Sequence, residues 1–169
     1  MTVAVLHRRP DLITASPLAA DELCRLVARV AARPEDWQAK LRFGSSQRWW
    51  RRLHSDDNLD VWLLTWVRDT GTDFHDHGGS AGAFSVVSGE LEEVRLGTTG
   101  SVVTTRLPAG ASRGIEPGVV HDVRSPSTLP AVSIHAYSPP LREMTFYAAD
   151  RAGPVPTRTV TTQNEGTLA

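Results

Sequence analysis

The sequence has a single cysteine, Cys24, among its 169 residues. One thiol excludes an intrachain disulfide and any zinc site built from several cysteines, so a metal bound by this chain must take its ligands from His, Asp or Glu. An excess of charge of one sign is also lacking, because 18 basic and 19 acidic residues give a formal net charge of −1. This balance predicts that the protein binds neither nucleic acid nor an anionic membrane surface.

Long hydrophobic runs are missing as well. No stretch approaches the roughly 20 apolar residues of a membrane-spanning helix, and segment 1–9 does not resemble a signal peptide. We therefore expect no membrane partner and a cytoplasmic location. The length suits one domain that buries a core without disulfides. We predict a single domain over 1–150, with an N-terminal helical segment, and a loose tail over 151–169, where apolar residues become scarce.

A helical pattern is present in the N-terminal part. Ser16 and Pro17 match an N-cap followed by proline at the first helical position, and leucine and valine then recur with helical spacing. We predict a helix over 17–32 that ends before Pro34, and one or two further turns over 35–41.

From residue 49 onward the sequence consists of short segments rich in β-branched and aromatic residues. Turns that contain Gly, Pro, Ser or Asp separate these segments. This spacing, with no helical pattern between the segments, predicts an all-β sandwich or barrel. Tight hairpin turns are expected at Ser88-Gly89 and at 97–100. The predicted strands are 59–67, 83–87, 91–96, 101–107, 119–123 and 131–137.

His75-Asp76-His77 is the most informative chemical signal. Alternate side chains of a strand point to one face, so the two imidazoles would converge while Asp76 points away. Imidazole is a frequent ligand of iron, copper, nickel and zinc. The pair therefore predicts a metal site, against the alternative of a surface loop with two incidental histidines.

The spacing around this pair resembles the first cupin motif, Gly-x5-His-x-His-x(3,4)-Glu-x6-Gly. His75, His77 and Gly89 are in register, whereas Gly82 stands where the glutamate ligand would be. The second motif, Gly-x5-Pro-x-Gly-x2-His-x3-Asn, is matched at Gly110, Gly118 and His121. The resemblance implies a jelly-roll-like β-barrel with one or two N-terminal helices. It also implies a metal bound by His75, His77 and His121 without a carboxylate, a ligand set similar to that of the thiol dioxygenases.

Segment 131–140, Ala-Val-Ser-Ile-His-Ala-Tyr-Ser-Pro-Pro, resembles a strand of the cysteine dioxygenase family that carries Ser-x-His-x-Tyr followed by Ser-Pro-Pro. Ser133, His135 and Tyr137 would share one strand face and form a hydrogen-bonded relay toward the metal. The family has a cis peptide bond before the first of these prolines, here Ser138-Pro139. Trp66, nine residues before the histidine pair, also resembles a tryptophan of animal members.

Arg51 is the predicted carboxylate-binding residue. Trp49-x-Arg51-x-Leu53 resembles an aromatic-x-Arg element of the family, whose planar guanidinium holds the carboxylate of cysteine. Arg48 and Arg52 are the alternatives, because the region is generally basic and the loop after Arg51 is shorter than in animal relatives.

The resemblance covers about residues 16–150 and implies a non-haem iron(II) enzyme that oxidises L-cysteine with O2 to cysteine sulfinic acid. A first alternative is another small thiol such as 3-mercaptopropionate. Relatives with that preference carry glutamine instead of the arginine, and a shifted alignment would place Gln47 there. A second alternative is a non-enzymatic cupin that binds a small ligand. A third is a zinc or nickel hydrolase or isomerase, which the ligands alone would permit.

Overall fold

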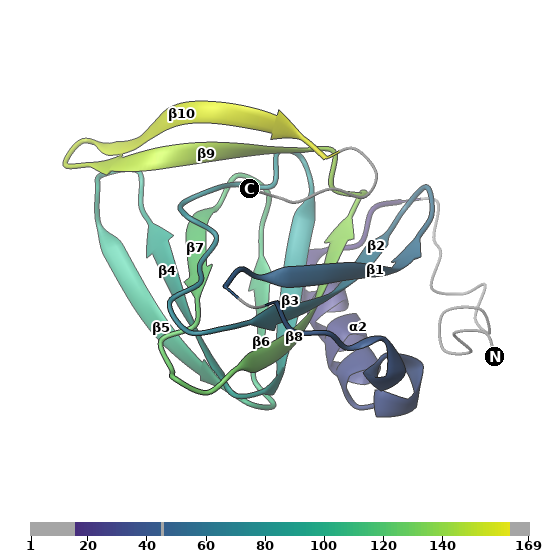
Figure 1. Ribbon diagram of the computed structural model, residues 1–169. Coiled ribbons are helices and arrows are strands. Elements are labelled where there is room, and N and C mark those ends of the chain that lie inside the picture. Colours follow the sequence, from purple (N-terminus) through teal and green to yellow (C-terminus); the bar gives the residue numbers. More distant parts are fainter. Residues whose placement is uncertain (1–15, 45, 163–169) are drawn as a thin grey trace.

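The computed structural model describes residues 16–44 and 46–162. Within these residues the chain forms helices near its N-terminal end and then a succession of strands (Figure 1). In chain order the elements are α2 (Ala20–Ala31), η2 (Pro34–Asp36), η3 (Gln38–Lys40), β1 (Trp49–Ser55), β2 (Asp60–Trp66), β3 (Ala81–Ser88), β4 (Glu90–Leu96), β5 (Val102–Pro108), β6 (Ser112–Ile115), β7 (Val120–Arg124), β8 (Ala131–Ser138), β9 (Glu143–Asp150) and β10 (Gly153–Thr161).

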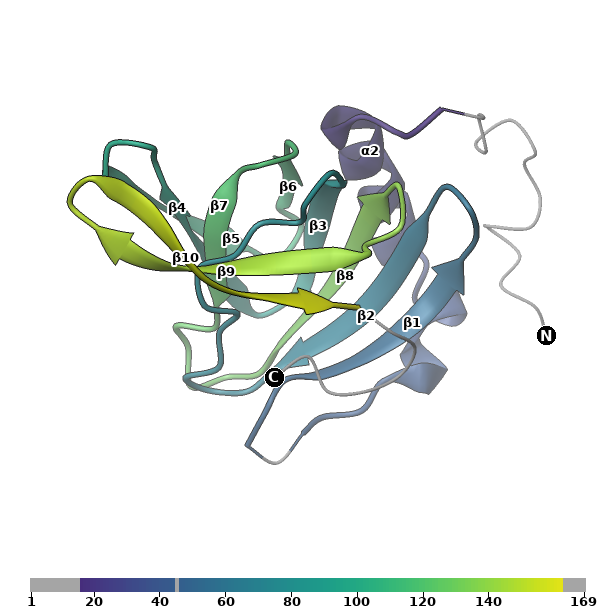
Figure 2. The same ribbon diagram turned by 90° about the horizontal axis from the view of Figure 1, so that it is seen from above.

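The strands form two facing sheets and a separate hairpin. The larger sheet has the order β1-β2-β8-β3-β6, the smaller one has the order β5-β4-β7, and β9 pairs with β10. The two sheets enclose a barrel-like interior, and the β9–β10 hairpin lies across one of its ends (Figures 1 and 2). The all-β architecture expected from the strand spacing is therefore confirmed.

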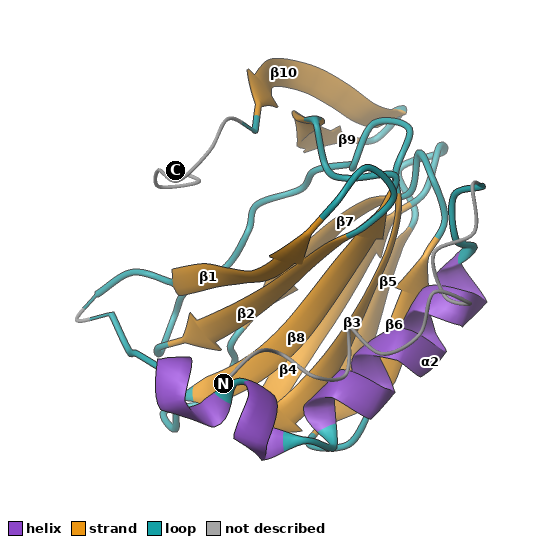
Figure 3. Ribbon diagram, turned by 90° about the vertical axis from the view of Figure 1, so that its right-hand side faces the viewer, coloured by secondary structure: helices purple, strands orange, loops and turns teal. Residues whose placement is uncertain are grey.

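Side chains alternate along β8, so one face of the larger sheet packs against the helix and the other faces the barrel interior. Val132, Ile134 and Ala136 pack in one apolar cluster with Leu23 and Val27 of α2, so this face is covered by the helix (Figure 3). The residues between them point into the barrel. Side chains on the interior face of this sheet thus meet the smaller sheet, and they include the predicted relay.

A second apolar cluster fills the barrel interior between the sheets. Trp66, Phe84, Leu91 and Val123 are all buried there, from strands β2, β3, β4 and β7. This cluster adjoins the polar site described below, so the relay side chains lie next to a packed wall.

The helix predicted over 17–32 is confirmed, but it begins at Ala20. The backbone N–H of Leu18 donates to Oγ of Ser138 at 2.8 Å, which ties this residue to the end of β8. The N–H of Ala19 donates to the carboxylate of Glu22 at 2.9 Å and closes the first turn. The further turns expected over 35–41 are the two 3-10 helices. No helix among residues 16–44 and 46–162 is long and apolar enough to cross a membrane.

The expectation of a loose tail from residue 151 is wrong over the part that the structure describes. Strand β10 pairs with β9 along its whole length, from Gly153 opposite Asp150 to Thr161 opposite Glu143. Backbone hydrogen bonds need no apolar side chains, so a polar sequence can still form this strand, and Val160 packs against the apolar cluster of β9. Segments 1–15 and 163–169 of the predicted domain and tail lie outside the described residues.

One of the two predicted hairpin turns differs from the expectation. Residues 97–100 join the paired strands β4 and β5, as predicted. Ser88-Gly89 instead connects β3 to β4, which belong to different sheets. Gly89 has a φ of 75°, and a Cβ there would lie 2.8 Å from the carbonyl oxygen of Pro130. Glycine is therefore required where the chain passes from one sheet to the other.

Candidate metal centre and substrate pocket

His75 and His77 lie in an extended segment between β2 and β3, and not in a regular strand as the sequence predicts. The backbones of His75 and His121, on β7, exchange two hydrogen bonds of 2.9 Å. The extended backbone still alternates, so the two imidazoles turn inward. Asp76 points away, as expected, toward β9, where its carboxylate accepts a hydrogen bond of 2.6 Å from the hydroxyl of Tyr147.

The three histidines direct their Nε2 atoms toward one another. Nε2 of His77 lies 3.2 Å from that of His75 and 3.4 Å from that of His121. Metal–nitrogen bonds of about 2.0–2.1 Å at octahedral or tetrahedral angles separate ligand nitrogens by about 2.9–3.4 Å. The three side chains therefore have the spacing of a metal site, and all three are buried.

The outer ring nitrogens determine where the protons lie. Nδ1 of His75 is 2.9 Å from the backbone carbonyl of Asp73, and Nδ1 of His121 is 2.9 Å from a carboxylate oxygen of Glu93. Carbonyl and carboxylate oxygens accept hydrogen bonds, so both Nδ1 atoms carry the proton and both Nε2 lone pairs point to the centre. Burial, reinforced by the neighbouring imidazoles, lowers the pKa of His75 and His77 well below 6.5, which keeps these rings neutral at pH 7.

Gly82 of β3 lies beside the third ring. A Cβ at this position would be 3.1 Å from Nδ1 of His77 and 3.3 Å from Cδ1 of Tyr137. The residue that replaces the glutamate of the cupin motif therefore adjoins a ligand, but it supplies no carboxylate. Among the described residues the cluster consists of three imidazoles, a donor set that suits iron, copper, nickel or zinc.

Glu93 of β4 is a residue of this site that the sequence analysis missed. Its side chain has no exposed surface, and besides His121 it contacts Arg113 at 2.7 Å and Arg95 at 3.0 Å. Burial opposes ionisation, but the hydrogen bond to His121 and the charge of Arg95 outweigh it and lower the pKa of Glu93 to about 2. The local signal in the sequence was a glutamate two residues after Leu91, on the same strand face as this buried leucine.

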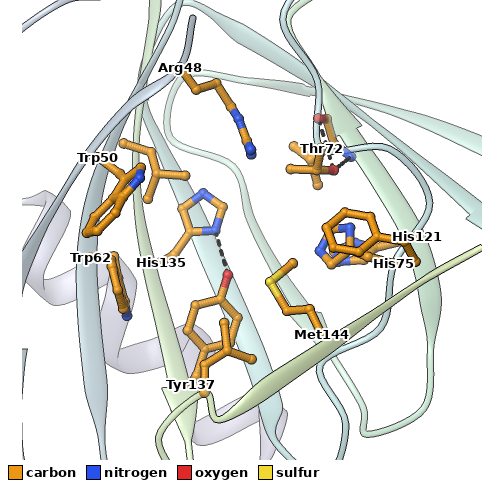
Figure 4. A pocket seen from close by; sticks show the side chains of 13 residues that line it. Arg48, Trp50, Trp62, Thr72, His75, His121, His135, Tyr137 and Met144 are labelled. Carbon is orange, nitrogen blue, oxygen red and sulfur yellow. Dashed lines mark hydrogen bonds between the residues drawn. The ribbon is translucent and has the colours of Figure 1, made fainter. Parts of the chain in front are cut away.

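The predicted relay forms a chain of hydrogen bonds on the interior face of β8. The indole N–H of Trp66 donates to Oγ of Ser133 at 2.8 Å, and this oxygen lies 2.8 Å from Nε2 of His135. Nδ1 of the same ring lies 3.5 Å from the hydroxyl of Tyr137 (Figure 4). The ring also stacks on Phe84, with centroids 5.1 Å apart. The peptide bond Ser138-Pro139 at the end of β8 is cis, as expected.

The relay allows two arrangements of its protons. The Trp66 indole can only donate, so Oγ of Ser133 accepts from it and keeps one proton and one further lone pair for Nε2 of His135. With Ser133 as the donor, the His135 proton lies on Nδ1 and faces the oxygen of Tyr137, which leaves the phenolic proton free to point into the pocket. Burial, with the charge of Arg48 nearby, lowers the pKa of His135 to about 3, and burial raises the pKa of Tyr137 above its usual value. Both groups are neutral at pH 7.

Arg51 does not lie in the pocket. It is exposed on β1, where it pairs with Leu63 and thus shares the face of the sheet that turns to the helix side. Trp50, one residue earlier, pairs with Leu64 and lines the pocket. Arg48 has the same parity as Trp50 and also lines the pocket, which makes it the arginine that the structure brings to the site.

The other two candidates for carboxylate binding are placed differently. Arg52 faces inward, but its guanidinium lies over the ring of Trp62 at 4.4 Å and 3.8 Å from the carboxylate of Asp60. Gln47 is exposed and does not line the pocket. Arg48 is therefore the cation best placed to meet a ligand.

Arg48 reaches into the pocket between the relay and the three-histidine cluster (Figure 4). Its guanidinium lies 5.1 Å from the ring centre of Trp66, and burial lowers its pKa from the ordinary value. Within 16–44 and 46–162 it forms no salt bridge of 4.0 Å or less. A half-buried cation that lines a pocket and has no carboxylate partner favours an anionic ligand. The opposite wall is apolar and comes from Leu141 and from β9, with Met144 and Phe146.

The low pKa of His135 predicts a pH dependence of stability. The folded state keeps this ring neutral down to about pH 3, whereas the unfolded chain protonates it below about pH 6.5. The unfolded state thus binds more protons in this window, and the free energy of unfolding should fall as the pH drops from 7.5 to 5. Urea unfolding of the metal-free protein at both pH values measures the difference, which should shrink in His135→Gln. An equal difference in the variant would contradict the assignment.

Comparisons with known proteins agree with this geometry. The family model for cysteine dioxygenase type I matches residues 2–150. A cysteine dioxygenase type 1 from Danio rerio is 26% identical over 152 residues, which are 83% of this chain and 74% of that protein. A crystal structure of a protein from Thermus thermophilus matches 62% of this chain and 94% of its own, with a TM-score of 0.54 and 21% identity. A cupin superfamily protein from Desulfitobacterium hafniense matches 61% of this chain and 87% of its own, with a TM-score of 0.53 and 8% identity. The fold is a cupin barrel, and the chain belongs to the cysteine dioxygenase type I family.

Proposed function

We propose that this protein is an iron(II)-dependent thiol dioxygenase and that its substrate is L-cysteine, which it converts with O2 to cysteine sulfinic acid. The observation that carries the proposal is one pocket lined by the half-buried Arg48, which has no carboxylate partner among the described residues, by two of the three converging histidines and by Tyr137. These groups match the parts of a small amino acid thiol. Family membership supports the reaction class.

Arg48 binds the carboxylate of the substrate. A guanidinium presents a planar fork that fits a carboxylate with two parallel hydrogen bonds, and burial of the pair strengthens them. Met144 and Phe146 leave an apolar wall for a short carbon chain. A substrate anchored at Arg48 would extend its thiol toward the histidines, since both line the same pocket.

Iron(II) held by His75, His77 and His121 would lower the pKa of the thiol and provide the redox chemistry that adds both atoms of O2 to sulfur. The chain's own contribution is orientation and a hydrogen-bond donor. With His135 as donor to Tyr137, the phenolic O–H is directed toward the pocket, where it can stabilise negative charge on oxygen or sulfur. The apolar wall limits the access of water to the reacting atoms.

Oxygen uptake by the iron(II)-loaded protein is the direct test. We expect one O2 consumed for each L-cysteine, with the sulfinic acid as product and both of its new oxygen atoms derived from labelled O2. 3-Mercaptopropionate and cysteamine are measured in parallel. Cysteamine lacks the carboxylate and should react poorly, because it makes no contact with Arg48. Absence of uptake with every thiol would reject the dioxygenase, and a preference for 3-mercaptopropionate would reject L-cysteine as the substrate.

Arg48→Gln should reduce kcat/KM for L-cysteine by about 10- to 100-fold, mainly through a higher KM, because a hydrogen bond to a charged group contributes about 1.5–3 kcal/mol. Arg51→Gln is the matched control, since it removes the same charge three residues away on the opposite face of the sheet. Steady-state kinetics should show Arg51→Gln near the activity of the original protein. The reverse ranking of the two variants would restore Arg51 as the carboxylate-binding residue.

Tyr137→Phe should slow turnover by about 100-fold or more while iron binding stays within about threefold of the original, because the hydroxyl contacts the relay and not the ligand nitrogens. Rapid-mix kinetics and a metal titration separate the two effects. Full activity of the phenylalanine variant would show that the hydroxyl of Tyr137 does not act on the reacting atoms.

The non-enzymatic alternative receives no support from the pocket, because a ligand-binding cupin would not need the chain of hydrogen bonds from Trp66 to Tyr137. The cytoplasmic location expected from the sequence stays a prediction.

A further inference from the structure

Glu93 is a fully buried carboxylate at the centre of a small ionic cluster. Removing such a group from water costs several kcal/mol unless charges and hydrogen bonds compensate it. The barrel interior around it is otherwise apolar, with Leu91 on one side and Val123 opposite on β7. An uncompensated carboxylate would be unfavourable here. The groups that contact Glu93 must therefore stabilise its charge, and they indicate its role.

The strand register brings Glu93 to the rear of one ligand. Glu93 pairs with Val123 and Arg95 pairs with His121, so Glu93 and His121 occupy diagonal positions on adjacent strands. The two carboxylate oxygens divide their contacts. Oε1 accepts the proton of Nδ1 of His121 at 2.9 Å, while Oε2 faces Nε of Arg113 at 2.7 Å and Nε of Arg95 at 3.0 Å.

The two arginines hold the carboxylate from β4 and β6. Arg95 additionally donates from Nη2 to the carbonyl of Gly114 at 2.6 Å, which fixes its own guanidinium to β6. The arginine side chains are 28% exposed for Arg95 and 34% exposed for Arg113. They therefore compensate the charge of Glu93 inside the barrel and also reach the solvent at its edge. The cluster thus connects a buried ligand to the protein surface.

From this geometry we infer that Glu93 is a positioning residue of the metal centre, which holds the ring of His121 in its ligating tautomer and orientation and increases the basicity of its Nε2. The inference rests on the metal site of the proposed function but not on the identity of the thiol. A hydrogen bond from the outer nitrogen to a carboxylate strengthens a histidine ligand, and loss of such a partner reduces metal affinity by about 10- to 100-fold.

The three ligands are supported unequally. His75 donates to a backbone carbonyl, which no side-chain substitution removes. Nδ1 of His77 is buried and has no hydrogen-bond partner among the described residues. Glu93 is therefore the carboxylate that supports a ligand of this cluster. It binds a ligating histidine, whereas the glutamate of the cupin motif would bind the metal itself.

The test is metal affinity in the variant Glu93→Gln, measured with zinc(II) and a competing chelator. Glutamine keeps the shape of the side chain but removes its charge, and we expect affinity to fall about 10- to 100-fold. Glu92→Gln is the matched control, because Glu92 is the next residue on β4 and faces two other arginines, Arg106 and Arg124, at 3.9 and 3.5 Å. Its affinity should equal that of the original protein.

A second variant separates the hydrogen bond from the stability of the cluster. Glu93→Asp keeps the charge between the arginines but withdraws the carboxylate from His121 by the length of one methylene. It should therefore lose metal affinity even though it remains folded, and it keeps the test decisive if Glu93→Gln does not fold. In the zinc-loaded original protein, proton NMR should show a downfield, slowly exchanging Nδ1 proton of His121, and this signal should move upfield in Glu93→Asp.

Unchanged affinity in both folded variants, or an Nδ1 proton that does not shift, would overturn the positioning role. The result is independent of turnover. If the original protein binds metal tightly and Glu93→Asp does not, yet no thiol is oxidised, the proposed function fails and the role of Glu93 stands. If thiols are oxidised and both variants bind metal normally, the inference about Glu93 alone fails.

Discussion

The convergence of three buried imidazoles is the constraint on which the rest of the site depends. Two of them must direct Nε2 lone pairs to the same point, because their Nδ1 protons are committed to oxygen acceptors. Nε2 of His77 lies 3.2 Å from that of His75 and 3.4 Å from that of His121, so one cation placed between the three nitrogens could accept a lone pair from each ring. The fold meets this requirement by bridging the extended segment of His75 to β7, so that the backbone itself fixes the spacing of two ligands.

The two faces of the larger sheet explain how a small barrel provides both stability and chemistry. On β8, every second residue packs against α2, and the residues between them form the relay. One strand thus anchors the helix and carries the proton chain, so the positions of Ser133, His135 and Tyr137 are held by the apolar packing on the reverse side. Strand β9 lines the pocket from another direction with the apolar side chains of Met144 and Phe146.

Local periodicity was sufficient to predict the helix, the all-β class and the shared face of the relay. Arg51 was misplaced because the aromatic spacing of Trp49-x-Arg51 does not reveal which face of β1 turns inward. That face is set by pairing with β2, and a shift of one residue reverses it. Strand β10 was missed since its stability comes from backbone pairing with β9. Glu93 was missed because its role depends on contacts between β4, β6 and β7, which no local pattern contains.

The central claim is that one pocket holds both a metal on three histidines and a thiol carboxylate on Arg48. A crystal structure of the iron(II)-loaded protein with L-cysteine, prepared without oxygen, measures this most directly. We expect anomalous density for iron within bonding distance of Nε2 of His75, His77 and His121, the cysteine sulfur beside it, and the carboxylate paired with Arg48. Iron bound elsewhere, or a cysteine carboxylate that contacts Arg51 and not Arg48, would contradict the account.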